Sequence, residues 1–320
     1  AAGAVAYDTL VIATGASARR PELPAGDIEG VYCLRTLQDS RELRSRAAQP
    51  DAGPDRNAVV VGGGLLGLEA AHGLEALGYR VTVVHRNKHI MNRQLDTAGG
   101  QLLQAQLEQQ GIVFRLEAVL KSVRAPAGRV VGLELADGHS LPCELLLFAT
   151  GIEPNIALAR ASGLRTERGV QVDDFLRTSV RDIFALGECC QVGQECFGLV
   201  APIQAQARVL AGALQCRSVR GFVNEPWPTQ LKVSGVEIFS AGELSDSGDE
   251  LVLRDWTNGV YRRLVLRDDR LVGAVLVGDK RSGNWYSELI QSKQPVTAFR
   301  SGLMFGRQVS EAMQSTAQAA

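Results

Sequence analysis

Three glycines between residues 58 and 69 have the spacing of a loop that binds the diphosphate of a dinucleotide. Gly62, Gly64 and Gly67 follow the pattern G-x-G-x-x-G, which is weak evidence when it stands alone. In such a loop the first glycine permits a tight turn, the second lets backbone amides approach phosphate, and the third lets a helix pack closely on a strand. The chemistry is electrostatic, because free N–H groups at a helix N-terminus attract negative charge.

The residues on either side of these glycines predict the strand and the helix that must hold the loop. An apolar, β-branched run at 59–61 leads into it, and apolar residues then recur at helical spacing from Leu68 to Leu77. A turn at Gly78 and a second apolar run at 80–84 follow. This order of elements favours dinucleotide binding over the alternative of glycines that only make turns.

The end of the second run indicates which coenzyme would bind. A coenzyme with a free 2′-hydroxyl usually meets an acidic residue there. This chain has His85 and Arg86 instead, followed by Lys88 and His89. A basic patch would suit the 2′-phosphate of NADPH, and a solvated loop with incidental charge is the alternative. We therefore expect NAD(P)H and leave the choice between NADH and NADPH open.

A repeated phrase indicates a second nucleotide fold. LVIATGA at 10–16 and LLFATGI at 146–152 are each a short apolar strand that ends in Ala-Thr-Gly, and one complete βαβ unit separates them. A third strand, at 182–186, ends in Gly187 and Glu188. Glycine permits close approach to a ligand, and the carboxylate can accept hydrogen bonds from a sugar-like polyol.

These segments resemble the flavoprotein pyridine-nucleotide oxidoreductases, which carry FAD and NAD(P)H folds in tandem. The matching segments are YDTLVIATGA, VVVGGGLLGLEAA, LLFATGIEPN and TSVRDIFALGE. Within that group the chain is most similar to the flavin module of the assimilatory NAD(P)H-dependent nitrite reductase large subunit. The narrower match depends on residues 92–100, 187–189, 197–202 and 271–279. The resemblance extends to about residue 290.

The resemblance implies that FAD would lie against Thr14 and Gly15, with Gly187 and Glu188 at its ribityl chain or pyrophosphate. The family's own FAD fingerprint, a further G-x-G-x-x-G on a first strand, has no counterpart in this sequence. We therefore expect that roughly a hundred residues, comparable to a small domain, precede residue 1 in the complete protein. The present chain alone should bind FAD weakly or not at all.

For NAD(P)H the resemblance implies that the glycine loop holds the dinucleotide and that Gly151 lies beside it. Glu69, one turn into the following helix, would point toward the contact between nicotinamide and flavin as a catalytic residue. The alternative is a carboxylate in the first turn that the helix dipole favours. Both interpretations stay open at this stage.

The implied reaction is hydride transfer from NAD(P)H to FAD, and electrons would then pass to an iron–sulfur and sirohaem acceptor that reduces nitrite. That acceptor would lie C-terminal to this chain or on a partner. A second hypothesis is a free-standing NAD(P)H reductase of a ferredoxin- or rubredoxin-like carrier. A third is a nucleotide-binding module without catalytic activity.

Composition excludes several other classes of protein. The chain has 320 residues, 45% of them hydrophobic, and a formal net charge of −1. Near-neutral charge favours neither nucleic acid nor an acidic membrane surface as a partner. The longest apolar stretch is interrupted by glycine and charge, so it cannot span a bilayer. We expect a cytoplasmic protein, and a homodimer stays an open expectation.

Cysteine and histidine do not form a metal site in the sequence. The six cysteines lack any C-x-x-C pair and are Cys33, Cys143, Cys189, Cys190, Cys196 and Cys216. We expect buried free thiols in a reducing compartment. His72 and His139 have no spaced partners, so we expect no metal. The flavin-dependent dithiol reductases, which this chain resembles, use a histidine base near their C-terminus. No histidine follows residue 139 here, which argues against disulfide reduction.

The predicted fold class is α/β, with tandem Rossmann-like FAD- and NAD(P)H-binding domains and a small α+β C-terminal domain. Within these, helices are expected from about 35 to 46 and from about 96 to 110, a β-meander turns at Asp137, and a hairpin turns at Asp268. The expected domains are a remnant of the FAD domain (1–53), the NAD(P)H domain (54–152), the second part of the FAD domain (153–222), the C-terminal domain (223–308) and a tail or linker (309–320).

Overall fold

The computed structural model describes residues 3–21, 28–48, 56–215, 217, 220–225, 227–245 and 248–318. These residues form two compact units. Unit 1 contains Ala1–Arg19 and Gly151–Trp227, and unit 2 contains Arg20–Thr150 and Pro228–Ala320. Each unit is therefore assembled from two segments that are far apart in the sequence.

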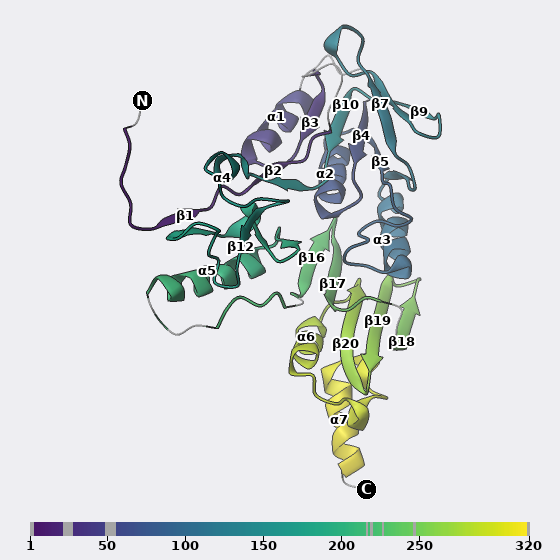
Figure 1. The fold of residues 1–320 in the computed structure, drawn as a ribbon. Helices are drawn as coiled ribbons and strands as arrows, with labels where there is room; N and C mark the ends of the chain where they lie inside the picture. The colour runs from purple at the N-terminus through teal and green to yellow at the C-terminus, as the bar shows by residue number, and fades with distance from the viewer. Residues whose placement is uncertain are drawn as a thin grey trace. The chain divides into compact units, whose positions relative to one another are not determined.

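The centre of unit 2 is a five-stranded parallel sheet (Figure 1). Its strands are β3 (Val31–Cys33), β4 (Asn57–Val61), β5 (Arg80–Val84), β6 (Val113–Arg115) and β10 (Leu145–Phe148). Their order across the sheet is β3-β10-β4-β5-β6. The helices connected to it are α1 (Leu37–Ala47), α2 (Leu65–Ala76) and α3 (Thr97–Gln109). The predicted βαβ arrangement of the glycine loop is confirmed.

Both faces of this sheet are covered, which is why its strands are continuously apolar. Val60 and Leu147 are fully buried in a core that includes Leu68 of α2. Val59 and Leu146 belong to a different core, which they share with the meander strands β7 (Leu120–Arg124), β8 (Gly132–Leu135) and β9 (Ser140–Pro142). The meander is antiparallel and turns at Asp137, as predicted.

Local caps define the two predicted helices. Thr36 caps α1, and its hydroxyl and the side chain of Asp39 exchange hydrogen bonds with each other's backbone. Asp96 caps α3 by accepting a hydrogen bond from the Gly99 amide at 3.1 Å. These side chains satisfy amides that would otherwise lack a partner in the first turn.

The C-terminal part of unit 2 is an antiparallel sheet. Its strands are β16 (Thr229–Val233), β17 (Val236–Gly242), β18 (Asp249–Asp255), β19 (Val260–Arg267) and β20 (Arg270–Val277), in the order β16-β17-β20-β19-β18. The predicted hairpin is confirmed, and Asp268 and Asp269 make its turn with positive φ angles. Helix α6 (Gly283–Ser292) packs on β17 and β20. Together these elements are the predicted α+β domain.

The tail predicted after residue 308 is instead helical. Two short 3₁₀ turns, Thr297–Phe299 and Leu303–Phe305, lead into helix α7 (Arg307–Gln318). Gly306 has a φ of +91°, which only glycine adopts without strain, and α7 begins directly after it. Ser310 is 1% exposed, so the first turn of the helix is packed against the molecule.

The two sheets of unit 2 share one hydrophobic core. Helix α3 contacts β19 and β20, and its residues Leu103 and Leu107 are buried together with Ile238 and Val275. Polar contacts cross the same interface, where the Tyr261 hydroxyl donates to the Asp96 carboxylate. The C-terminal sheet is therefore held to the parallel-sheet part of unit 2 by side-chain packing as well as by the covalent connection.

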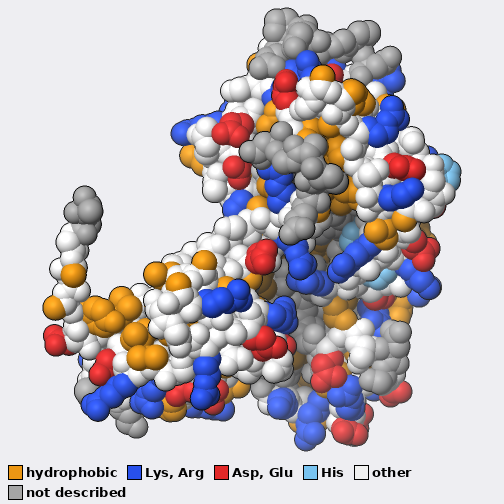
Figure 2. All heavy atoms as spheres, turned by 45° about the horizontal axis from the view of Figure 1, so that its top comes forward, with side chains coloured by type: hydrophobic (Ala, Val, Ile, Leu, Met, Phe, Trp, Pro, Cys, Tyr) orange, Lys and Arg blue, Asp and Glu red, His pale blue; other side chains and the backbone are white. Residues whose placement is uncertain are grey.

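The described residues of unit 1 form three small sheets and two α-helices. The parallel pair is β1 (Leu10–Ile12) with β13 (Ile183–Ala185), the antiparallel pair is β2 (Ala16–Ala18) with β11 (Ile152–Pro154), and the third sheet is β12 (Val170–Val172), β14 (Cys190–Val192) and β15 (Glu195–Cys196). The helices are α4 (Ala157–Ala161) and α5 (Val200–Leu214). Hydrophobic side chains gather near the N-terminal segment, where Val5, Tyr7 and Val11 are exposed (Figure 2).

The division into units differs from the predicted domains at residue 53. Strand β3 lies at the edge of the parallel sheet of unit 2, and Leu43 of α1 is buried in its core. Residues 28–48 therefore belong to the parallel-sheet part of unit 2 and not to the predicted FAD remnant. Within the part of the chain that the structure describes, none of the helices combines the length and apolar character that a membrane crossing needs.

Candidate functional site

The glycine loop connects β4 to α2, and backbone atoms enclose two of its three glycines. A Cβ on Gly62, whose φ is +126°, would lie 2.3 Å from the Ala149 carbonyl oxygen. A Cβ on Gly67 would lie 1.9 Å from the Gly62 carbonyl oxygen. Both contacts are far inside van der Waals distance, so only glycine permits this packing of helix on strand.

Gly64 has the opposite environment. It is the N-cap of α2, and no atom lies within 4 Å of the position that its Cβ would take. Its carbonyl oxygen accepts the amide of Leu68 at 3.0 Å, so the helix is regular from its first turn. The first amides of α2 are therefore next to open space, where the N-terminus of a helix can attract an anion.

His85 and Arg86, which directly follow β5, face different surroundings. His85 is 9% exposed, and its Nδ1 accepts a hydrogen bond from the Gly63 amide at 3.1 Å. Burial lowers its pKa below 6.5. Arg86 and Lys88 are exposed. The imidazole is thus turned toward the glycine loop, and the contact of either His85 or Arg86 with a 2′-phosphate stays a prediction.

Glu69 is an exposed residue of α2 whose carboxylate meets the C-terminal sheet. Its Oε1 accepts a hydrogen bond from the Ser234 amide, at 2.9 Å, in the turn between β16 and β17. The first turn of α2 contains no acidic residue, so the alternative of a helix-dipole carboxylate is wrong. A catalytic role for Glu69 stays a prediction.

In unit 1, Asn155 holds the Ala-Thr-Gly turn in place. The Thr14 hydroxyl donates to the Asn155 carbonyl oxygen at 2.6 Å, and the Asn155 side-chain amide donates to the Thr14 carbonyl oxygen at 2.9 Å. The Asn155 backbone amide also donates to Gly15, and Ser17 donates to its side chain. Our sequence reasoning did not select this residue, although it lies only three residues after the second copy of the repeated phrase.

The third predicted strand brings Gly187 and Glu188 to the same turn. Gly187 has a φ of +87°, and its amide donates to Oε1 of the fully buried Gln206 at 2.9 Å. A Cβ on Gly15 would lie 4.0 Å from the Glu188 carboxylate. The fold thus places a carboxylate beside a glycine turn, which fits the polyol part of FAD. Gln206 is a second residue that sequence reasoning missed.

Gly151 marks the passage from β10 to β11. Its φ is +104°, and its carbonyl oxygen accepts the amide of Arg19 at 2.9 Å. Two of the three places where the chain changes units, after residue 19 and after residue 150, are therefore adjacent. A position beside NAD(P)H stays a prediction for Gly151.

The cysteines of the described residues have the character of structural thiols. Five of them are free, and burial raises the pKa of both Cys143 and Cys190 to about 12. Such thiols are poor nucleophiles at neutral pH. Among the residues that the structure describes, no group of three or more histidine, cysteine or acidic side chains could hold a metal.

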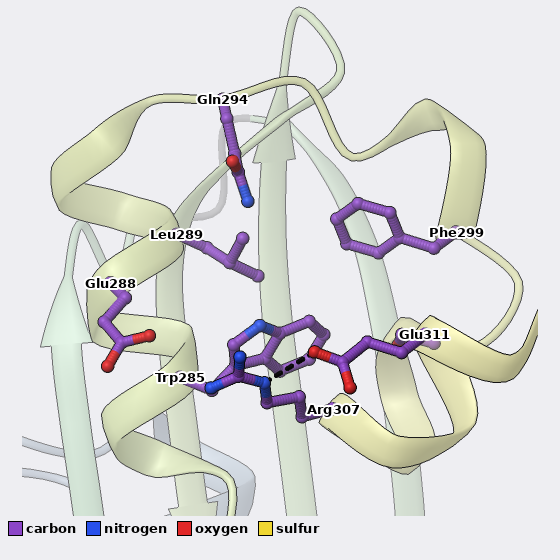
Figure 3. A pocket seen from close by; sticks show the side chains of 8 residues that line it. Trp285, Glu288, Leu289, Gln294, Phe299, Arg307 and Glu311 are labelled. Atoms are coloured by element: carbon purple, nitrogen blue, oxygen red, sulfur yellow. Dashed lines mark hydrogen bonds and ion pairs between the residues drawn. The ribbon is translucent and has the colours of Figure 1, made fainter. Parts of the chain in front are cut away.

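A cavity of about 200 Å³ lies in the C-terminal part of unit 2, away from all predicted site residues. Trp285 and Phe299 line it, and Arg307 and Glu311 form an ion pair at 2.7 Å on its wall (Figure 3). It is small for a ligand pocket. Nothing in its lining corresponds to the chemistry of a dinucleotide.

Together these features define an α/β protein with one complete dinucleotide-binding loop and a second nucleotide-type unit. Comparison with known proteins agrees with that class. Residues 2–208 match the family described as pyridine nucleotide-disulphide oxidoreductase, and residues 228–294 match the rubredoxin NAD+ reductase C-terminal domain. The chain belongs to the pyridine nucleotide-disulphide oxidoreductase family. The predicted fold class and the broader resemblance are confirmed, and FAD and NAD(P)H are consistent with this family.

Individual relatives are similar over most of the chain. A nitrite reductase [NAD(P)H] of Bacillus subtilis is 39% identical over 91% of the chain, which covers 36% of that protein. A rubredoxin-NAD(+) reductase of Pseudomonas putida is 30% identical over 87% of the chain and 72% of that protein. A solved ferredoxin reductase of Rhodopseudomonas palustris has a TM-score of 0.75, at 28% identity over 85% of the chain and 67% of its own. The chain spans about a third of the length of the first curated relatives that it matches.

Proposed function

We propose that this chain is the NAD(P)H-oxidising flavin module of an assimilatory nitrite reductase. In this function hydride passes from NAD(P)H to FAD, and electrons continue to an iron–sulfur and sirohaem acceptor outside this chain. The observation that carries the proposal is the 39% identity to a nitrite reductase over 91% of the chain. The open cradle at Gly64 supports the coenzyme part of it.

The residues of this chain would bind and orient the cofactors. FAD, when bound, supplies a two-electron acceptor for hydride and a donor of single electrons. Gly64 and the first turn of α2 would hold the diphosphate of NAD(P)H. Asn155 fixes the turn at Gly15 on which FAD would rest, and Glu188 would accept hydrogen bonds there. The protein's contribution is geometry, since hydride transfer requires the two rings to be aligned and close.

A second candidate function is the reduction of a rubredoxin- or ferredoxin-like carrier. The C-terminal sheet matches the rubredoxin NAD+ reductase C-terminal domain at residues 228–294, and the chain covers 72% of a rubredoxin-NAD(+) reductase. In that case the electrons would leave on a small diffusing protein.

The test uses the complete gene product, purified with FAD, and compares acceptors. We expect oxidation of NAD(P)H that depends on nitrite and yields ammonium. Reduction of rubredoxin or ferredoxin without nitrite turnover would favour the second candidate. Binding of NAD(P)H without reduction even of ferricyanide would leave a nucleotide-binding module and contradict both enzymatic functions.

A further inference from the structure

The middle residue of the glycine loop, Gly63, is held through both of its backbone polar groups. Its amide donates to His85 Nδ1 at 3.1 Å, and its carbonyl oxygen accepts the Met91 amide at 2.8 Å. Gly63 directly precedes Gly64, the N-cap of α2. The direction of the loop amides therefore depends on a side chain from the end of the neighbouring strand.

The imidazole also packs directly on the loop. A Cβ on Gly63 would lie 2.9 Å from His85 Cγ and 3.1 Å from Ile90 Cγ2. The backbone of His85 is fixed in turn, because its amide donates to Arg115 and its carbonyl oxygen accepts from Ala118. The ring is thus a rigid support for Gly63 rather than a side chain that reaches into solvent.

This contact exists for only one protonation state of His85. A neutral imidazole with its proton on Nε2 leaves a lone pair on Nδ1 for the Gly63 amide. An imidazolium carries a proton on both nitrogens, so Nδ1 and the amide would then present two donors to each other. The hydrogen bond would be lost, and the loop would have to move.

We propose that neutral His85 is a positioning residue of the coenzyme site: its Nδ1 holds Gly63 so that the amides at Gly64 and the start of α2 face the diphosphate, and protonation weakens binding of the coenzyme. The inference rests on the proposed role of the loop in binding NAD(P)H. It does not depend on which protein or nitrogen compound accepts the electrons.

The groups around the ring set the direction of the pH dependence. Burial is the main cause that lowers the pKa of His85, and the charges of Arg86 and His89 lower it further, while the polar groups of Asn92 and of the His89 backbone oppose them. From the neighbouring strand, the Arg115 carbonyl oxygen accepts the His85 amide at 2.8 Å. The neutral form therefore prevails at neutral pH, and the supporting contact is lost as the pH falls through a value below 6.5.

A direct contact between cationic His85 and phosphate predicts the opposite. In that case protonation would strengthen binding, because a positive charge would be added beside the phosphates. The sign of the pH effect on affinity therefore separates a positioning residue from a phosphate ligand.

The experiment measures the Kd of ADP-ribose by calorimetry on the full-length, flavin-loaded protein from about pH 8 to about pH 5, the range in which histidine titrates. ADP-ribose carries the diphosphate, has no 2′-phosphate that titrates in this range, and cannot transfer hydride. For the wild type we expect the Kd to rise roughly tenfold toward acid pH, the size expected for one lost hydrogen bond.

Three variants make the result specific. His85→Asn places an oxygen where Nδ1 lies and does not titrate, so its Kd should stay within roughly threefold of the neutral wild type at every pH, since the hydrogen bond is kept. His85→Leu should bind roughly tenfold more weakly without pH dependence. His139→Asn is the matched control, since His139 is an exposed residue of the meander whose Nδ1 lies 3.2 Å from the Asp137 carboxylate and not at the loop. It should keep the wild-type pH profile.

The inference is overturned if the wild-type Kd is flat or falls toward acid pH, or if His85→Asn keeps the wild-type profile. Thermal unfolding of each variant without ligand reports whether it is folded. Should His85→Leu not fold, the wild-type profile and His85→Asn still decide. A wild-type protein that binds no ADP-ribose at any pH would instead contradict the proposed coenzyme site itself.

Discussion

A methyl group added to Gly67 would lie 1.9 Å from the Gly62 carbonyl oxygen, whereas one added to Gly64 would have no atom within 4 Å. The three fingerprint glycines therefore have different physical tasks, although the sequence pattern treats them alike. Gly62 and Gly67 are required by the fold itself. Gly64 is required only if a ligand must come close to the backbone. Substitutions at these glycines can therefore distinguish an effect on folding from an effect on coenzyme binding.

We expect Gly67→Ala to destabilise the protein by about 2–3 kcal/mol, because α2 must move away from β4 to accommodate the methyl group. Gly64→Ala should cost less stability, since alanine there is only a poorer N-cap than glycine. It should raise the Kd for NAD(P)H roughly tenfold, because its methyl group would occupy the space where phosphate would meet the amides. Urea unfolding and calorimetry measure the two effects.

Gly73→Ala on the same helix is the matched control for these substitutions. Gly73 is exposed, and its Cβ would also have no atom within 4 Å. Since alanine is the better helix former, this variant should gain about 0.5–1 kcal/mol with unchanged coenzyme binding. Equal losses of stability at positions 64 and 67 would contradict the division of tasks.

The exposed Arg86 carries the prediction about coenzyme choice. Arg86→Ala should raise the KM for NADPH roughly tenfold or more, the size expected for a lost charge-assisted hydrogen bond, and change the KM for NADH little. Steady-state kinetics of the flavin-loaded protein with both coenzymes measure this difference. Lys88→Ala tests whether the nearby exposed cation contributes. Equal effects on NADH and NADPH would remove the idea of a 2′-phosphate site.

At the scale of residues, the sequence predicted the positions of the functional glycines but not those of the side-chain amides that hold the turns. The spacing of Gly62 to Gly67 follows from local geometry, so a short pattern contains it. Asn155 and Gln206 act through hydrogen bonds to turns that lie 141 and 19 residues away in the chain. Nothing about an asparagine in a loop or a glutamine on a helix specifies such distant partners, so only the fold identifies them.

At the scale of elements, the junction of α3 with the C-terminal sheet contains a charged residue that is almost completely buried. Arg263 is 2% exposed and contacts Asp96 at the start of α3, Glu250 on β18 and the Leu244 carbonyl oxygen. A buried guanidinium is tolerated only when its donors are satisfied in this way. The arrangement makes the junction sensitive to acid.

The sign of that sensitivity follows from the pKa of Glu250. The hydrogen bond from Arg263 lowers it below the ordinary 4.5. A carboxylate with a lowered folded pKa stabilises the native state above its unfolded pKa, and this stabilisation is lost as the pH falls through the folded value. We expect the free energy of unfolding to decrease below pH 4.5, and Glu250→Gln to remove about 1 kcal/mol of that decrease.

Urea unfolding at neutral pH and at several values below 4.5 measures the effect. Glu153→Gln, on β11 of unit 1, controls for the loss of one negative charge elsewhere. An acid slope that is the same in Glu250→Gln and the wild type would show that this ion pair does not contribute.

The elements themselves were predictable where local signals were strong. The helices α1 and α3, the meander and the hairpin at Asp268 all carry caps, turns or clear periodicity. Residues 31–33 fell within the predicted FAD remnant, because strand β3 pairs with β10, which lies more than a hundred residues away. Helix α7 was missed because its sequence is rich in small polar residues and has few apolar ones. Its packing against the 3₁₀ turns is a tertiary effect, which local sequence does not show.

At the scale of the whole molecule, unit 2 should unfold as one cooperative body, although the sequence suggests two domains there. Ile238 of the C-terminal sheet is fully buried in the same core as Val60 of the parallel sheet and Leu107 of α3. Unit 1 has a core of its own, around Val170 and Cys190. Cores that share side chains lose stability together, whereas separate cores do so independently.

We therefore expect Ile238→Ala to destabilise unit 2 by about 2–5 kcal/mol, the cost of a cavity at a fully buried site. Hydrogen exchange at low denaturant should lose protection equally in β4–β5 and in β19–β20. Val170→Ala, in the core of unit 1, is the matched control and should leave both regions protected. If Ile238→Ala releases only the amides of the C-terminal sheet, that sheet is an independent domain, and the shared core does not couple it to the coenzyme loop.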